Sequence, residues 1–182
     1  MECIKLNGKT FRKAIAHDEI IEKIELLADR LNADYANCTT PPIIIGMLNG
    51  AFMFYSELVK RLKFDCEVSF MKMKSYAGTH STGQVSQLIG LEKDITYRDV
   101  IIVEDIVETG NTISTAWKIL QEKNPRSIKV ATMMFKPESY NIKHIPIEYY
   151  AMIIPEDFII GFGLDYDELG RNLPDIYSLI ED

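Results

Sequence analysis

The sequence has few cysteines, no excess of positive charge and no long apolar segment. Cys3, Cys38 and Cys66 are odd in number and form no C-x-x-C pair, which argues against a disulfide framework or a zinc site. The formal net charge of −7 argues against a broad nucleic-acid-binding face, which would be basic. No apolar run is long enough to span a membrane, and the first residues lack the apolar core of a signal peptide. These absences predict a cytoplasmic protein that binds neither membranes nor nucleic acids.

The residues that are present fit one globular domain. The chain has 182 residues, of which 47% are hydrophobic and 26% are charged. Apolar residues recur at helical spacing from 17 to 35, and short apolar runs bounded by turn residues predict buried strands. The expected strands cover residues 43–47, 65–73, 100–103, 127–135 and 148–154.

One stretch, 99–112, organises the chain. Four β-branched residues, Val100–Val103, predict a strand buried on both faces, and Glu104 and Asp105 stand where we expect it to end. A small polar loop, 108–112, then leads into an amphipathic helical pattern. A loop at a helix N-terminus offers backbone N–H groups to an anion. The two carboxylates would repel a bare phosphate, but they suit a ligand that also carries hydroxyl donors or a cation.

This stretch resembles the signature of the type I phosphoribosyltransferases, which bind phosphoribosyl pyrophosphate (PRPP). The resemblance implies that Glu104 and Asp105 bind the ribose hydroxyls and contribute to a metal site. It further implies that the loop binds the 5′-phosphate through Thr109, Gly110, Asn111 and Thr112. From the residues alone, an ordinary buried strand, turn and helix also remains open.

The resemblance covers about residues 40–182 and implies a fold. We expect an α/β fold with a mostly parallel twisted sheet flanked by helices. The chain would form a single domain, with a core of about residues 17–154 and a small hood from about 1–16 and 155–182.

Two site residues depart from the hypoxanthine branch of the family. That branch usually has an aspartate before the threonine and glycine of the phosphate loop, assigned to general acid–base work, whereas this chain has Glu108. The turn Leu48-Asn49-Gly50 corresponds to a pyrophosphate-binding turn that contains a non-proline cis peptide and usually a lysine before the glycine. Asn49 replaces that lysine, which removes a cation and leaves the backbone donors. An ordinary turn is the alternative interpretation.

The carboxyl-terminal part supplies the remaining site residues. Lys136 ends the predicted strand 127–135, on the rim where ligands bind in open α/β sheets, although a solvated lysine would fit the pattern equally well. The resemblance implies that Lys136 donates to the 6-oxo group of a purine, that Phe158 stacks on the ring and that the backbone of Ile159 reads its edge. Asp165 would bind Mg²⁺ and Arg171 would bind pyrophosphate.

A polar segment from 74 to 83 begins with Lys74-Ser75-Tyr76, which resembles the start of the flexible catalytic loop of the family. It predicts either a lid that closes over PRPP or a mobile surface hairpin. We assign no role to His80 within it.

Together these features predict an enzyme of purine salvage. It would transfer the phosphoribosyl group from PRPP to N9 of hypoxanthine, and of guanine, to give IMP or GMP and pyrophosphate, with Mg²⁺ as cofactor and as a homodimer or homotetramer. Two alternatives remain. One is a transferase for another base such as xanthine. The other is a PRPP-binding regulator of nucleotide metabolism that binds RNA or DNA, which the acidic charge and the implied base pocket disfavour.

Overall fold

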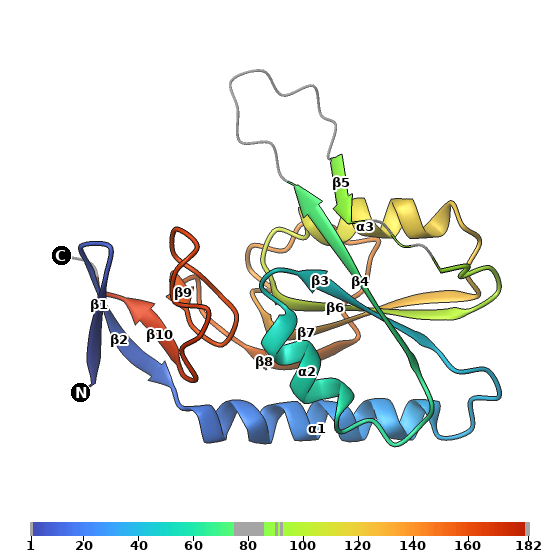
Figure 1. Cartoon of the computed structure of the whole chain (residues 1–182), viewed down its shortest axis with the longest axis horizontal. Helices are drawn as coiled ribbons and strands as arrows, with labels where there is room; N and C mark the ends of the chain where they lie inside the picture. Colours follow the sequence, from blue (N-terminus) through green and yellow to red (C-terminus); the bar gives the residue numbers. More distant parts are fainter. Residues whose placement is uncertain (1, 75–85, 90, 92, 181–182) are drawn as a thin grey trace.

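The computed structural model describes residues 2–74, 86–89, 91 and 93–180, and its centre is a six-stranded sheet with the order β5-β4-β3-β6-β7-β8 (Figure 1). All neighbouring strands are parallel except β5, which pairs antiparallel with β4 at one edge. The prediction of a mostly parallel α/β fold is therefore confirmed. The strands are β3 (Ile43–Leu48), β4 (Glu67–Lys74), β5 (Ser86–Ile89), β6 (Asp99–Val107), β7 (Ser127–Phe135) and β8 (Tyr149–Ile153).

Helices cover both faces of this sheet. The helices α1 (His17–Tyr35) and α2 (Phe52–Val59) lie on one face, and α3 (Asn111–Gln121) lies on the other (Figure 1). Side chains alternate along each strand, so Ile44 packs in the cluster of α1 and α2 whereas Ile43 and Ile45 pack in the cluster of α3. This explains why β3 and the part of β6 from Val100 to Val103 are apolar throughout: both of their faces are buried.

A second, antiparallel sheet joins the two ends of the chain in the order β1-β2-β10-β9. Its strands are β1 (Cys3–Leu6), β2 (Lys9–Ile15), β9 (Ile159–Ile160) and β10 (Ile176–Leu179). Phe11, Ile160 and Tyr177 form its small core. Asp175 links this sheet to the beginning of α1. Its carboxylate pairs with Lys13 of β2 at 2.8 Å and accepts the backbone N–H of His17 at 2.8 Å. The predicted hood boundaries at residues 16 and 155 stay a prediction.

One expectation about the central stretch is wrong. The strand β6 does not end before the acidic pair but runs on to Val107. Its pairing with β3 stops at Val103, opposite Gly46 and two residues before β3 ends, but its pairing with β7 continues to Val107 opposite Phe135. Glu104 and Asp105 therefore lie inside a strand that is held on one side only.

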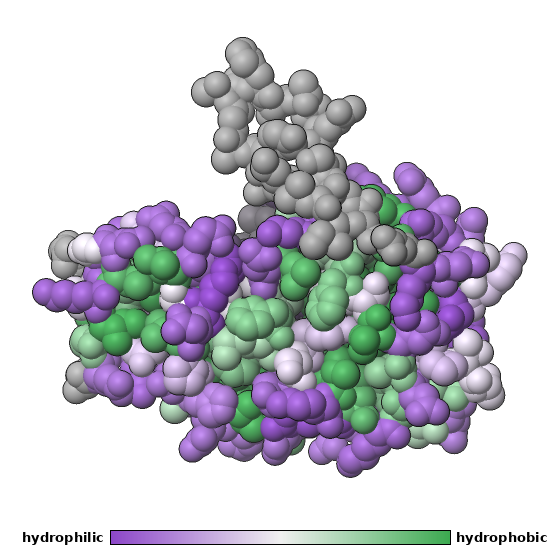
Figure 2. Space-filling view, viewed as in Figure 1, coloured by the Kyte–Doolittle hydropathy of each residue, from purple (hydrophilic) through white to green (hydrophobic). Residues whose placement is uncertain are grey.

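The surface shown in Figure 2 carries hydrophobic residues over the region that α2 and β4 occupy in Figure 1. Phe52 of α2 and Val68 and Phe70 of β4 are large apolar side chains that are 39–47% exposed. Of the helices in the described residues, none has the length and apolar character needed to cross a membrane.

Candidate active site

Polar groups from three adjacent strands meet at one rim of the large sheet. The strand β3 ends in the turn Leu48-Asn49-Gly50, β6 carries the acidic pair and the loop before α3, and β7 ends at Lys136. Ligands of open α/β sheets bind at the carboxyl ends of the strands. A cavity of about 210 Å³ opens there. It is lined by Glu104 and by residues 106–113.

Asp105 and one carboxylate oxygen of Glu104 are buried, and the protein supplies hydrogen bonds to only part of the pair. Asp105 is 8% exposed, and its Oδ1 accepts the N–H of Ile106 at 2.9 Å. Burial raises the pKa of Asp105 to about 6. Burial, followed by the charge of Asp105, raises the pKa of Glu104 well above its ordinary value, and the Oε2 atom of Glu104 is buried without a hydrogen-bond partner. A ligand that donates hydroxyl groups, or a cation, would satisfy this oxygen and favour the charged carboxylates.

The turn after β3 is packed directly against the acidic strand. The peptide bond between Leu48 and Asn49 is cis, as the resemblance implied. A Cβ atom on Gly50 would lie 1.6 Å from Oδ2 of Asp105, and one on Gly163 would lie 2.1 Å from the carbonyl oxygen of Gly50. The close contact of turn, acidic strand and carboxyl-terminal segment therefore requires glycine at both positions.

The conformation of the loop after β6 requires glycine at position 110. This residue has a φ of +85°, and a Cβ atom on it would lie 2.4 Å from the ring of Tyr140 and 2.9 Å from Ile142. Gly110 stands directly before α3, and its carbonyl accepts the first helical N–H, from Ser114, at 2.8 Å. The loop thus lies at the positive end of a helix dipole, as an anion site requires. The support from Tyr140 was missed, because residues 137–147 carry no periodic pattern.

Lys136 is a buried cation, which excludes the alternative of a solvated lysine. It is 3% exposed, its ammonium pairs with the carboxylate of Glu108, and it donates to the carbonyl oxygen of Asp157 at 3.0 Å. An ammonium has three N–H donors, and these two contacts use two of them. Glu108 keeps 49% of its side chain exposed, so the pair sits between the buried rim and the cavity. The spacing of the residues gave no sign of this ion pair.

The carboxyl-terminal segment brings together the other predicted residues. Arg171 pairs with Oδ1 of Asp165 at 2.8 Å and donates to the carbonyl oxygen of Gly163 at 3.0 Å. Phe158 is 47% exposed, and its ring meets that of Tyr166 edge-on at 5.8 Å. Ile159, the neighbouring residue, begins β9. An exposed aromatic ring of this kind offers a stacking surface.

The structure does not test some of the predicted residues. Ser75, Tyr76 and His80 lie outside the described residues, and so does the side chain of Lys74. Within the residues described, no group of three or more His, Cys, Asp or Glu side chains could hold a metal ion.

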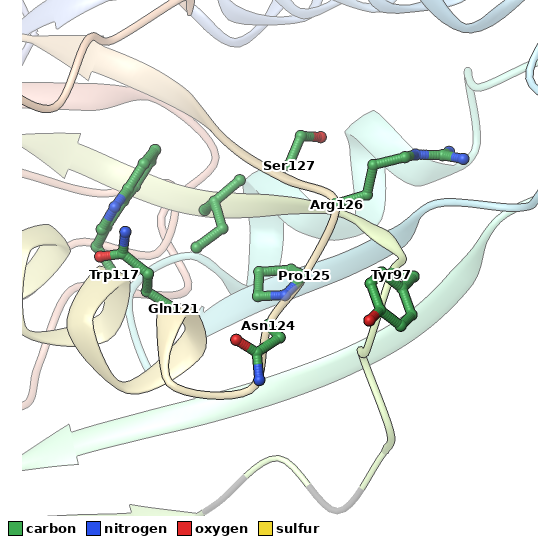
Figure 3. A pocket seen from close by; sticks show the side chains of 8 residues that line it. Tyr97, Trp117, Gln121, Asn124, Pro125, Arg126 and Ser127 are labelled. Atoms are coloured by element: carbon green, nitrogen blue, oxygen red, sulfur yellow. The ribbon is translucent and has the colours of Figure 1, made fainter.

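A second cavity, of about 450 Å³, lies at the opposite end of the sheet (Figure 3). It is lined by residues near the end of α3 and the beginning of β7, among them Trp117, Gln121 and Ser127. It contains none of the predicted site residues, so its larger volume does not make it the candidate site.

A parallel sheet with an acidic pair and a glycine loop at a helix N-terminus is an arrangement suited to a ligand that carries both hydroxyl groups and a phosphate. The family model described as "Phosphoribosyl transferase domain" matches residues 13–168. The chain is 39% identical to the hypoxanthine-guanine phosphoribosyltransferase of Streptococcus pneumoniae over 169 residues, 92% of each protein. The chain therefore belongs to the phosphoribosyltransferase family, in its hypoxanthine-guanine branch.

Solved structures agree with this assignment. A hypoxanthine phosphoribosyltransferase from Staphylococcus aureus is 36% identical, with a TM-score of 0.85 over 93% of this chain and 91% of that chain. The Trypanosoma cruzi hypoxanthine phosphoribosyltransferase is 30% identical, with a TM-score of 0.86 over 97% of this chain and 95% of that chain. The recognition of the family from the sequence is thus confirmed.

Proposed function

We propose that the protein transfers the 5-phosphoribosyl group of PRPP to N9 of hypoxanthine or guanine, in purine salvage. The C1–oxygen bond of PRPP breaks and pyrophosphate leaves, the C1–N9 bond forms, and the purine gives up a proton. One observation carries this proposal: the buried ammonium of Lys136 stands on the same rim as the acidic pair and the glycine loop before α3. The rim thereby offers complementary groups to a purine, a ribose and a phosphate.

Lys136 would select the base. Its remaining N–H donor suits the 6-oxo group of hypoxanthine or guanine, whereas the 6-amino group of adenine offers it no acceptor. Phe158 would stack on the purine ring, and the backbone of Ile159 would read its edge. Lys136 and Phe158 suit any 6-oxopurine, so xanthine stays an alternative substrate.

Glu108 would be the acid–base group. Its carboxylate lies at the cavity beside Lys136, where the family resemblance implies a group near purine N7. Compared with aspartate, glutamate moves its oxygens by about 1.5 Å, one C–C bond length. Its ion pair with Lys136 supports a carboxylate held beside the residue that would bind the base.

The remaining groups would bind PRPP. Glu104 and Asp105 would accept hydrogen bonds from the ribose hydroxyls, and the loop of Thr109, Gly110, Asn111 and Thr112 would bind the 5′-phosphate. The turn of Leu48, Asn49 and Gly50 would bind pyrophosphate together with Arg171.

Mg²⁺ is the cofactor that fits this site. The unpartnered Oε2 of buried Glu104 supports a cation or a donor at that position. Asp165 and the acidic pair would contribute carboxylates to bound Mg²⁺, with oxygens of PRPP completing the coordination. When bound, Mg²⁺ neutralises charge on the leaving pyrophosphate.

We further infer that the protein acts in the cytoplasm as a homodimer or homotetramer. The free thiols of Cys3, Cys38 and Cys66 support a reducing compartment. The exposed apolar side chains of α2 and β4 support self-association. Light scattering after size-exclusion chromatography would measure the mass, and a monomer at micromolar concentration would contradict this inference.

An assay with purified protein, PRPP and Mg²⁺ tests the function on four bases. Hypoxanthine and guanine should react, and adenine should have a kcat/KM lower by about 5- to 150-fold, because an unpaired buried donor costs about 1–3 kcal/mol. Lys136→Met should lower kcat/KM for hypoxanthine, while Lys63→Met, at an exposed lysine, serves as the control. Adenine turnover comparable with hypoxanthine would contradict the role of Lys136.

A further inference from the structure

Two cations of the rim are already neutralised by carboxylates. Lys136 pairs with Glu108, and Arg171 pairs with Asp165 at 2.8 Å and with Glu168 at 3.1 Å. The acidic pair adds two further carboxyl groups at this rim, and that of Asp105 lies against Gly50 of the turn. A pyrophosphate at the turn after β3 would therefore bind in a strongly acidic neighbourhood. Besides Mg²⁺, a cationic side chain that the acids leave free would add to the charge compensation at this turn.

Lys72 of β4 supplies such a cation at this turn. Its ammonium donates to Oδ1 of Asn49 at 3.0 Å, and that partner is a neutral amide. The contact follows from the sheet, because β3 and β4 are parallel and Leu48 stands opposite Lys72. The register thus carries the ammonium from the neighbouring strand to the position where β3 turns.

We propose that Lys72 is the cationic group of the pyrophosphate site, which Asn49 cannot be. The proposal rests on the proposed function and deepens it. The amide oxygen of Asn49 accepts one hydrogen bond from the ammonium, which keeps two further N–H donors for the ligand, and the NH₂ group of Asn49 remains a donor for the same anion. Asn49 and Lys72 together thus present one charge and several donors beside the backbone of Gly50. The site keeps its electrostatic attraction although the turn itself has lost a charged side chain.

The test compares Lys72→Met with a matched control, Lys63→Met, whose lysine is 77% exposed and pairs only loosely with Asp29, at 3.6 Å. Hydrogen bonds to charged groups are worth about 1.5–3 kcal/mol, which corresponds to a factor of about ten or more. Lys72→Met should therefore raise KM for pyrophosphate in the reverse reaction, and KM for PRPP in the forward reaction, about tenfold or more. KM for hypoxanthine should stay within twofold, and Lys63→Met should match the wild type.

Two further variants separate charge from structure. Lys72→Arg should retain most of the affinity for pyrophosphate. The double variant Lys72→Met with Asn49→Lys should recover it, because it returns the charge through the turn itself. If KM for pyrophosphate rises in Lys72→Arg as much as in Lys72→Met, and the double variant does not restore it, Lys72 has a structural role and the proposal is overturned.

Calorimetric titration of the protein with magnesium pyrophosphate gives a readout that does not depend on turnover. Weaker binding by Lys72→Met, with binding restored in the double variant, would support the proposal. Equal binding by the wild type and Lys72→Met would overturn it. A wild type that binds pyrophosphate but transfers no phosphoribosyl group would refute the proposed function instead, and the comparison of variants would still decide the role of Lys72.

Discussion

Two strand–turn–helix units contain neighbouring strands of the sheet but present different chemical groups at the rim. In the unit β3–turn–α2, the strand ends at Leu48, and the turn that follows carries the neutral side chain of Asn49. The unit β6–loop–α3 continues four residues past its pairing with β3, because β7 still holds it, and places Glu104 and Asp105 in that extension. The second unit therefore adds carboxylate acceptors on its strand to the donors of its loop, whereas the first unit has no acid in its turn, although both begin as similar apolar strands.

The difference shows how two copies of the same supersecondary unit can bind different parts of one ligand. A strand that turns early exposes its amides to an anion, whereas a strand that continues carries side chains into the same space. The two units also differ in burial, since Asp105 is 8% exposed while Asn49 is exposed. Gly50 is the residue at which they touch.

The largest effect is expected where the two units meet. Gly50→Ala would place a Cβ atom 1.6 Å from Oδ2 of Asp105, so the turn and the acidic strand must move apart. A displacement of about 1 Å at a reacting centre costs about a hundredfold in rate. We expect kcat/KM for PRPP to fall about a hundredfold or more in a steady-state assay.

The matched control for this variant is Gly8→Ala. Gly8 also has a positive φ, of +77°, but a Cβ atom there would meet nothing within 4 Å. The control should lose about 1–2 kcal/mol of stability from backbone strain and keep its activity. A Gly50→Ala enzyme as active as this control would show that the two units need not be in close contact.

A smaller effect is expected at the end of the extended unit. Glu108→Gln should lower kcat at least tenfold with little change in KM for PRPP, because a positioned acid–base group contributes about 10²–10⁴ in rate. Glu108→Asp should stay active, since it retains the carboxylate. Glu122→Gln, at an exposed residue beyond α3, is the control. Full turnover by Glu108→Gln would remove the carboxylate from the chemical step.

Much of the fold follows from local pattern. The helical periodicity from 17 to 35 and the apolar run from 127 to 135 match α1 and β7 to the residue, since each is long and bounded by polar or turn residues. The rim position of Lys136 followed from the end of β7. The residue roles drawn from the family resemblance stay predictions, although the structure brings most of those residues to one rim.

Contacts between strands could not be predicted in the same way. The end of β6 depends on β7, which continues to pair with it after its pairing with β3 has stopped. The hydrogen bond from Lys72 to Asn49 depends on the register of β3 against β4, and the ion pair of Lys136 with Glu108 joins two strands. None of these partners is close in sequence, so periodicity carries no information about them.

The smallest effect concerns the stability of the extended unit without ligand. Burial raises the pKa of Asp105 from 3.8 to about 6, so the folded state binds a proton more tightly than the unfolded state does. For an acid with a raised pKa, the free energy of unfolding falls as pH rises from the unfolded to the folded pKa, that is, from about 4 to about 6. Glu104 contributes in the same direction, since its pKa is also raised.

Asp105→Asn should remove this penalty. Above about pH 6 the ligand-free variant should be more stable than the wild type, by about 1–3 kcal/mol, and near pH 4 the two should be equal. Urea unfolding at a series of pH values measures the difference in the free energy of unfolding between variant and wild type. Titratable groups that the substitution leaves unchanged contribute equally to both proteins and cancel. Asp175→Asn is the contrasting control: Lys13 lowers the pKa of Asp175, so its contribution is present at neutral pH and lost as pH falls. If Asp105→Asn is instead less stable than the wild type at pH 7, the buried acid contributes to folding, and the two units differ only in their chemistry.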